Sequence, residues 1–73
     1  MNDNEADILK KLGRRIRTFR EAQGLTLLDI EIETGIHNGH LSLIENGQKK
    51  VQFFTIYRIA KALKVPFSAL ADF

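Results

Sequence analysis

The chain of 73 residues has no cysteine, no tryptophan and a single proline. Without cysteine, neither disulfide bonds nor thiolate metal sites can stabilise it, which fits a reducing cytoplasm. No apolar run approaches the roughly 20 residues needed to cross a bilayer, and the polar residues 1–5 do not resemble a signal peptide. We therefore expect a cytoplasmic protein that makes no membrane contact.

Basic residues are missing from the middle of the chain. The eleven Lys and Arg residues fall within 10–20 and 49–64, whereas residues 21–48 contain five acids and no base. Two separate basic blocks indicate clamps on either side of a negatively charged partner. The alternative, in which these side chains only solvate helix surfaces, fits the charge pattern equally well.

The length allows one domain with a modest core and no separate ligand-binding domain. The apolar fraction of 44% is ordinary for a globular protein. We expect one domain over residues 1–73, with residues 1–6 as a disordered tail. Domains of this size have little stability to spare, so a partner subunit is expected.

Apolar residues spaced by three and four predict five short helices, so the expected fold class is all-α. The first covers residues 8–22, the second 27–34 and the third 38–45, which His37 or Asn38 can cap. A fourth apolar stripe ends at Leu63, and a short fifth helix follows Pro66 as far as Ala71.

Two of these segments also carry a strand signal. Residues 30–33 alternate between apolar and charged side chains, and residues 51–57 are rich in β-branched and aromatic ones. Helix is favoured at 27–34 because Thr26 and Asp29 have capping-box spacing before it and Gly35 follows it. Helix is favoured in the later segment because its apolar stripe continues for about ten residues.

Residues 26–45 have the pattern of a helix-turn-helix: a short helix, a turn built on Gly35 and a second short helix. The chain must reverse within a few residues there, and glycine adopts positive φ without strain. The outer face of the helix at 38–45 is then free to enter a major groove of DNA.

Here the sequence resembles the Xre/Cro-type helix-turn-helix regulators, a family that includes phage repressors. The matching stretches are LGRRIR (12–17), GLT (24–26), TGI (34–36), LSLIENG (41–47) and IAKAL (59–63). The resemblance covers nearly the whole chain and implies a compact five-helix domain like that of the lambda repressor. It implies a sequence-specific, double-stranded-DNA-binding transcriptional regulator, with repressor the favoured sign, found in the cytoplasm and associated with the nucleoid.

The resemblance also implies roles for individual residues. Base contacts are expected from the helix at 38–45 and the residue before it, namely His37, Asn38, Gly39, His40, Ser42 and Leu43. Asn38 suits adenine N6 and N7, His40 suits guanine, and Leu43 suits a thymine methyl group. Phosphate contacts are expected from Thr26, Leu27, Lys49 and Lys50. Arg20 and Glu45 are expected to form a buried structural ion pair.

Some positions depart from the family pattern. Glu31 stands where alanine is more common, and Lys64 stands where glycine is usual. Val51 replaces a usual proline, and Leu27, Leu28, Ile32 and Leu43 occupy places that are commonly polar. The exposed leucines and the acidic middle segment motivate an alternative function, in which the module makes protein–protein contacts as an antitoxin or adaptor.

Other functional classes find little support. His37 and His40 lack a third placed ligand, so no metal site is expected. No catalytic constellation, phosphate loop or cofactor motif is present, and an enzyme is not expected. The aromatic residues Phe54, Tyr57, Phe67 and Phe73 exceed the needs of so small a core. Either some are buried and the others lie singly exposed, or they form a homodimer seam along the fourth and fifth helices, which is the expectation favoured here.

Overall fold

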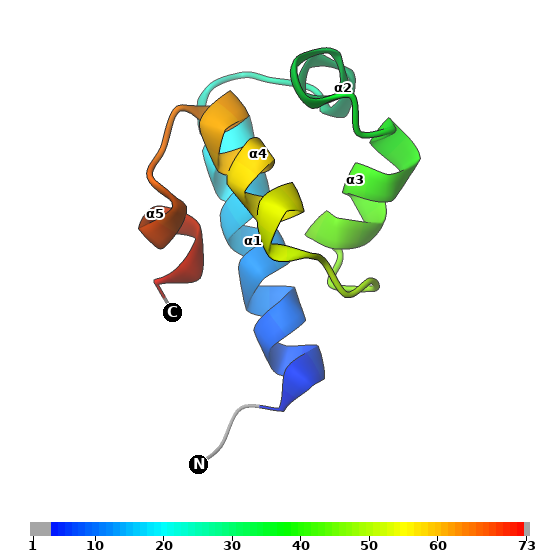
Figure 1. Cartoon of the computed structure of the whole chain (residues 1–73), viewed down its shortest axis with the longest axis vertical. Helices are drawn as coiled ribbons and strands as arrows, with labels where there is room; N and C mark the ends of the chain where they lie inside the picture. Colours follow the sequence, from blue (N-terminus) through cyan, green and yellow to red (C-terminus); the bar gives the residue numbers. More distant parts are fainter. Residues whose placement is uncertain (1–3, 73) are drawn as a thin grey trace.

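The computed structural model describes residues 4–72, and within them it contains five helices and no strand, as predicted. The elements are α1 (Glu5–Ala22), α2 (Leu27–Thr34), α3 (Asn38–Glu45), α4 (Phe53–Leu63) and α5 (Phe67–Ala71). In Figure 1, α1 and α4 form the centre, α3 lies on one side of them and α5 lies on the other. No helix within residues 4–72 combines the length and apolar character required to span a membrane.

The first helix begins earlier than the apolar pattern predicts. The Asn4 side chain accepts a hydrogen bond from the Asp7 backbone N–H at 2.8 Å, and Glu5 and Asp7 supply acids in the first turn. Both features stabilise a helix N-terminus. The predicted tail over residues 1–6 is therefore wrong for residues 4–6, whereas residues 1–3 lie outside the described part.

The second and third helices are joined as the turn chemistry predicts. Thr26 and Asp29 form the reciprocal capping box of α2, with bonds of 2.8 and 3.1 Å. Gly35 then ends α2 in the left-handed region, at φ 78°. The side chain that caps α3 is His37, and Asn38 is the first residue of the helix.

The core is aliphatic and is shared by all five helices. Its most deeply buried large side chains are Leu41, Ile44, Ile59, Leu63 and Leu70. Gly13 allows α1 to approach the end of α3, because a Cβ atom there would lie 2.4 Å from two carbonyl oxygens, those of Ile44 and Glu45. The inner face of α3 is thereby fixed against the domain, and its outer face is left to solvent.

Candidate nucleic-acid interface

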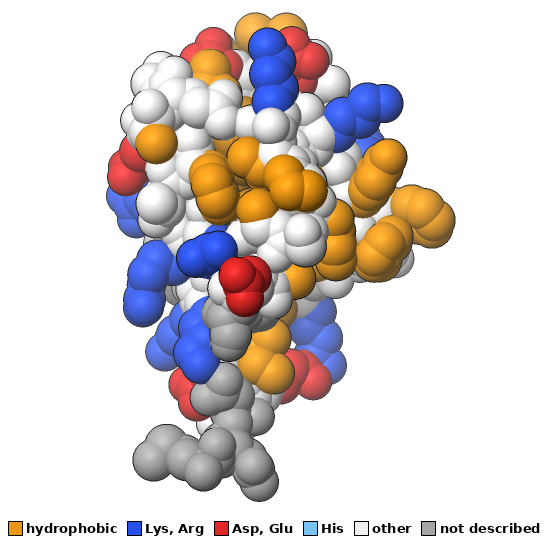
Figure 2. Space-filling view, turned by 90° about the vertical axis from the view of Figure 1, so that its left-hand side faces the viewer, with side chains coloured by type: hydrophobic (Ala, Val, Ile, Leu, Met, Phe, Trp, Pro, Cys, Tyr) orange, Lys and Arg blue, Asp and Glu red, His pale blue; other side chains and the backbone are white. Residues whose placement is uncertain are grey.

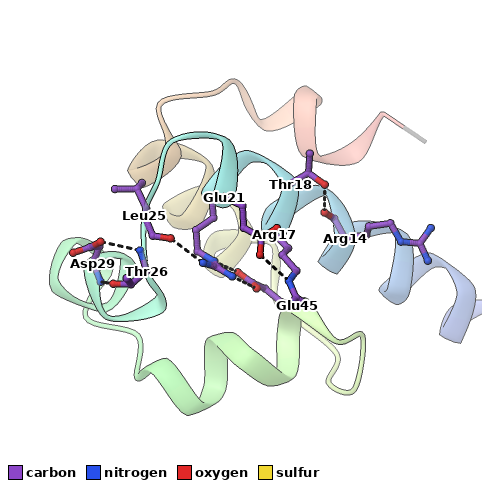
Figure 3. A network of polar contacts seen from close by, with 9 residues as sticks. Arg14, Arg17, Thr18, Glu21, Leu25, Thr26, Asp29 and Glu45 are labelled. Carbon is purple, nitrogen blue, oxygen red and sulfur yellow. Dashed lines mark hydrogen bonds and ion pairs between the residues drawn. The ribbon is translucent and has the colours of Figure 1, made fainter.

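A buried ion pair fixes the C-terminal end of α3 to α1. The Arg20 Nε and Nη2 atoms donate to the two carboxylate oxygens of Glu45 at 2.7 and 3.0 Å. The side chains are only 11% and 5% exposed. Arg20 also donates to the Leu25 carbonyl oxygen at 2.8 Å, so one guanidinium joins α1, the loop before α2 and α3 (Figure 3). The hydrogen bond with Glu45 raises the pKa of Arg20 above its ordinary value.

The N-terminal end of α3 is held by two side chains. His37 Nδ1 accepts the backbone N–H of Gly39 at 3.0 Å. Glu31 of α2 accepts both the backbone N–H and the side-chain Nδ2 of Asn38, at 2.9 and 2.8 Å. The backbone hydrogen bond from Asn38, followed by the side-chain bond, lowers the pKa of Glu31. An ionised carboxylate at a helix N-terminus is also favoured by the helix dipole.

The predicted base-contacting residues lie together along one side of α3. His37, Gly39 and Leu43 are exposed, whereas Asn38, His40 and Ser42 are half-buried at the edges of this face. Leu43 leaves 41% of its surface to solvent. All six residues belong to one short helix and its cap, so the structure brings together the set that the sequence analysis predicted.

Glu31 was not among the predicted site residues. Its role depends on a contact between α2 and α3 across the turn, seven residues apart in the chain. The only signal in the sequence was that an acid replaces the alanine common at this place. Propensity and periodicity could not have paired it with Asn38.

The N-terminus of α2 presents donors for an anion. The Asp29 carboxylate accepts a hydrogen bond from the Thr26 backbone N–H, and this bond lowers the pKa of Asp29. The Thr26 hydroxyl in turn accepts from the Asp29 backbone N–H. The N–H groups of Leu27 and Leu28, in the first turn of the helix, have no intrahelical acceptor. Leu27 is half-buried and keeps a backbone donor that the helix does not use, while Thr26 serves as the cap.

The two predicted phosphate-binding lysines are exposed in the loop after α3. Lys50 Nζ lies 2.9 Å from the Glu5 carboxylate, and these side chains are 80% and 67% exposed. The hydrogen bond with Glu5 raises the pKa of Lys50. Because both side chains are exposed, water and salt screen this pair, and Lys50 can exchange Glu5 for another anion. Lys49 is exposed beside it.

Several other basic residues have structural roles instead. Arg15 donates twice to the Ala69 carbonyl oxygen, at 3.0 and 2.8 Å, and so fastens α5 to α1. Arg58 of α4 donates to the Thr34 carbonyl oxygen at the end of α2. Some residues of the two basic blocks thus form hydrogen bonds between helices, and others are surface charges. The charge pattern of the sequence alone could not distinguish the two kinds.

Apolar side chains also gather on the surface away from α3. Phe53, Phe54 and Tyr57 of α4 are 56%, 73% and 49% exposed. The Phe53 ring lies 4.8 Å from that of Phe67 in α5, between ring centres. Figure 2 looks onto the side of the molecule that carries α5 and shows apolar side chains across it. Of the predicted dimer residues, Phe73 lies outside the described part of the chain.

Within residues 4–72 no group of three or more potential metal-binding side chains comes together. The imidazole of His37 is instead engaged as the cap of α3.

Comparison with known proteins identifies close relatives of this architecture. The helix-turn-helix family HTH_3 matches residues 16–70. The chain is 33% identical over 63 residues to the HTH-type transcriptional repressor RghR of Bacillus subtilis (strain 168), covering 85% of this chain and 47% of that protein. It is 32% identical over 59 residues to the uncharacterized HTH-type transcriptional regulator y4dJ of Sinorhizobium fredii (strain NBRC 101917 / NGR234), covering 81% and 77%.

A solved structure with the same fold is that of the restriction-modification controller protein C.AhdI from Aeromonas hydrophila. It superimposes with a TM-score of 0.82 at 31% identity, covering 85% of this chain and 94% of the other. The present chain spans about half the length of the Bacillus relative.

Proposed function

Because the chain belongs to the helix-turn-helix family HTH_3, we propose that it is a sequence-specific double-stranded-DNA-binding transcriptional regulator. It would repress transcription by occupying a promoter, and it would be located at the nucleoid. The observation that carries the proposal is how α3 is held in the domain. Both of its ends are fastened to the domain, while the side with the predicted base-reading residues faces solvent.

In the proposed complex α3 lies in the major groove and its exposed side meets base edges. Because Nδ1 of His37 accepts from Gly39, its neutral ring carries the proton on Nε2, which is then a donor toward guanine N7 or O6 or toward a phosphate. Gly39 allows close approach of the backbone. Asn38, His40 and Ser42 supply further polar contacts, and Leu43 meets a thymine methyl group.

Phosphates on either side of the groove are proposed to bind two parts of the surface. The N-terminus of α2 at Thr26–Leu27 forms one, with Leu27 as the backbone donor because the Asp29 carboxylate already accepts the Thr26 N–H, and the helix dipole of α2 favours an anion there. Lys49 and Lys50 form the other, with Lys50 exchanging Glu5 for a phosphate. These contacts would fix the register of α3 without reading sequence.

We further propose that the protein binds as a homodimer through α4 and α5. The exposed aromatic side chains of α4, beside Phe67 of α5, support this surface. It lies away from α3, so two copies joined there can each keep the reading side free. Two recognition helices one DNA turn apart would then bind a two-fold symmetric site.

Fluorescence anisotropy against duplex DNA from upstream of the protein's own gene tests the proposal, with a scrambled duplex beside it. We expect binding to the native duplex to be about a hundredfold tighter or more at physiological salt. The double substitution Lys49→Ala with Lys50→Ala should weaken binding to both duplexes. It should also lower the slope of log affinity against log salt by about 2, since each phosphate contact contributes about 0.9. Lys61→Ala, an exposed charge on α4, is the matched control.

A second candidate function is protein–protein contact, as in an antitoxin or adaptor. It is motivated by Leu28 and Ile32 of α2, which are 55% and 75% exposed within the acidic segment. Failure to bind any duplex at low salt would refute the DNA proposal and favour this one. A substitution of Ile32 that leaves DNA affinity unchanged but abolishes a partner's binding would show that the surface serves a protein.

A further inference from the structure

One carboxylate oxygen of Glu31 accepts both hydrogen-bond donors of Asn38. The backbone N–H of Asn38 lies 2.9 Å from Oε1, and its side-chain Nδ2 lies 2.8 Å from the same atom. A carboxylate that only capped α3 would need the backbone bond alone. The second bond restrains a side chain that stands at the edge of the reading side of α3, so the contact has a consequence for recognition.

The carboxylate determines which way the Asn38 amide points. An ionised carboxylate accepts hydrogen bonds and cannot donate, so the NH2 group of Asn38 must face Glu31 and Oδ1 must face away. Because the same oxygen also accepts the backbone N–H of Asn38, the amide hydrogen it takes is the one on the Cβ side. The other hydrogen, next to Oδ1, stays available.

The groups left free are those that read adenine. Adenine offers a donor at N6 and an acceptor at N7, and an asparagine amide meets both through its oxygen and the hydrogen beside it. With the amide turned over, its NH2 group would face N6–H2 and its oxygen would face N7, so neither bond could form. Guanine presents acceptors at both places, so it satisfies only the amide hydrogen and leaves Oδ1 facing an acceptor.

We propose that Glu31 is a specificity-determining positioning residue: it holds the Asn38 amide in the orientation that pairs with adenine in the major groove. The inference rests on the proposed function and assigns a role in it to an α2 residue that touches no base. The departure of Glu31 from alanine therefore has a function: α2 presets the reading residue of α3 before DNA arrives.

Glu31→Gln is the informative substitution because it keeps the shape and removes the restriction. A glutamine amide can accept from Asn38 or donate to its Oδ1, so both orientations of the Asn38 amide become available. Glu33→Gln is the matched control, since it removes the same charge from an exposed residue of the same helix. Asn38→Ala identifies the base pair that Asn38 reads.

The experiment is selection of binding sites from a random duplex library with the wild type and these three variants, after thermal melts show that each is folded. We expect one adenine preference to disappear in Asn38→Ala. Asn38→Ala loses the whole bidentate pair, about 5- to 150-fold, and in Glu31→Gln the same preference should fall by a smaller factor, because the productive orientation of the amide is still available. All other positions should keep their preferences, and Glu33→Gln should match the wild type.

Two outcomes would overturn the inference while leaving the proposed function intact: an undiminished preference in Glu31→Gln, or an equal loss at every position, which is what a purely structural cap would give. If the wild type selects no sequence at all, the proposed function itself fails, and the inference fails with it.

A measurement on the free protein tests the contact separately. The side-chain amide protons of Asn38 should show two distinct NMR signals, of which one shifts as Glu31 titrates. That shift should vanish in Glu31→Gln and persist in Glu33→Gln. A pH-independent Asn38 amide in the wild type would show that the contact is absent in solution.

Discussion

Glu45→Ala removes the counter-ion of Arg20 and leaves a guanidinium in a site where its side chain is only 11% exposed. Breaking a buried pair by removing one partner costs about 3–5 kcal/mol, because the remaining charge is neither solvated nor neutralised. At roughly 0.05–0.15 kcal/mol per residue, a chain of 73 residues has a free energy of unfolding of about 4–11 kcal/mol. The substitution should therefore remove a large part of the stability. Arg20 keeps its bond to the Leu25 carbonyl oxygen, which favours the lower end of the range.

Urea unfolding followed by far-ultraviolet circular dichroism measures the loss directly. The control is Glu21→Ala, which breaks the Arg17–Glu21 pair, whose side chains are 54% and 59% exposed. That loss should be about 0–1 kcal/mol. The double variant Arg20→Met with Glu45→Met should be less destabilised than Glu45→Ala, because no charge is stranded. If Glu45→Ala and Glu21→Ala differ by less than about 1 kcal/mol, the ion pair does not fasten α3 as argued.

Three further changes test other parts of the structure by the same urea titrations. Lys64→Gly should raise the free energy of unfolding by about 0.5 kcal/mol. Lys64 has φ 59°, and relief of about 1–2 kcal/mol of left-handed strain outweighs the greater conformational entropy that glycine gives the unfolded chain. A lower free energy of unfolding would contradict this. Gly13→Ala should cost about 1–3 kcal/mol or more, since the new Cβ would lie 2.4 Å from the Ile44 and Glu45 carbonyl oxygens; an unchanged midpoint would refute the close approach. Because the pKa of Glu31 is lowered from 4.5 in the folded state, its stabilisation is present above that pH and lost as pH falls through the lower value. The advantage of the wild type over Glu31→Gln should thus shrink in acid, and an advantage that grows there would contradict the sign.

The fold could be predicted from the sequence because local signals agree with one another. Capping at Thr26, a left-handed glycine at Gly35 and apolar spacing all indicate the same boundaries for α2, and this agreement overrides the strand signal at 30–33. At 51–57 the strand signal is overridden by the apolar stripe of α4, which continues to Leu63. The start of α1 was missed for a comparable reason. Asn4 supplies a cap, but it precedes the first residue of the apolar stripe, and a search that follows apolar spacing begins too late.

The finer arrangement of polar groups could not be predicted in the same way. Arg15, Arg58 and Lys50 are all basic, yet the first two donate to carbonyl oxygens of other helices and the third makes an exposed ion pair. Which carbonyl lies within reach depends on how α4 and α5 pack on their neighbours. Spacing along one helix does not contain that information, because each of these contacts joins different elements.

The fastening of α3 at both ends has a consequence for how DNA would be bound. A recognition helix that orders only on binding must offset its conformational entropy from the binding energy, at about 1–2 kcal/mol for the backbone of each residue. Here α3 is ordered during folding, by Glu31 and His37 at one end and by the Arg20–Glu45 pair at the other. The energy of the interface contacts can then contribute to affinity and specificity.

Substitutions at these four residues should therefore weaken DNA binding even where they touch no base, and part of that loss should recur as reduced stability of the free protein. Substitution of a residue proposed to contact bases, such as Leu43, should instead lower affinity with the stability unchanged, and this difference separates the two kinds of residue experimentally.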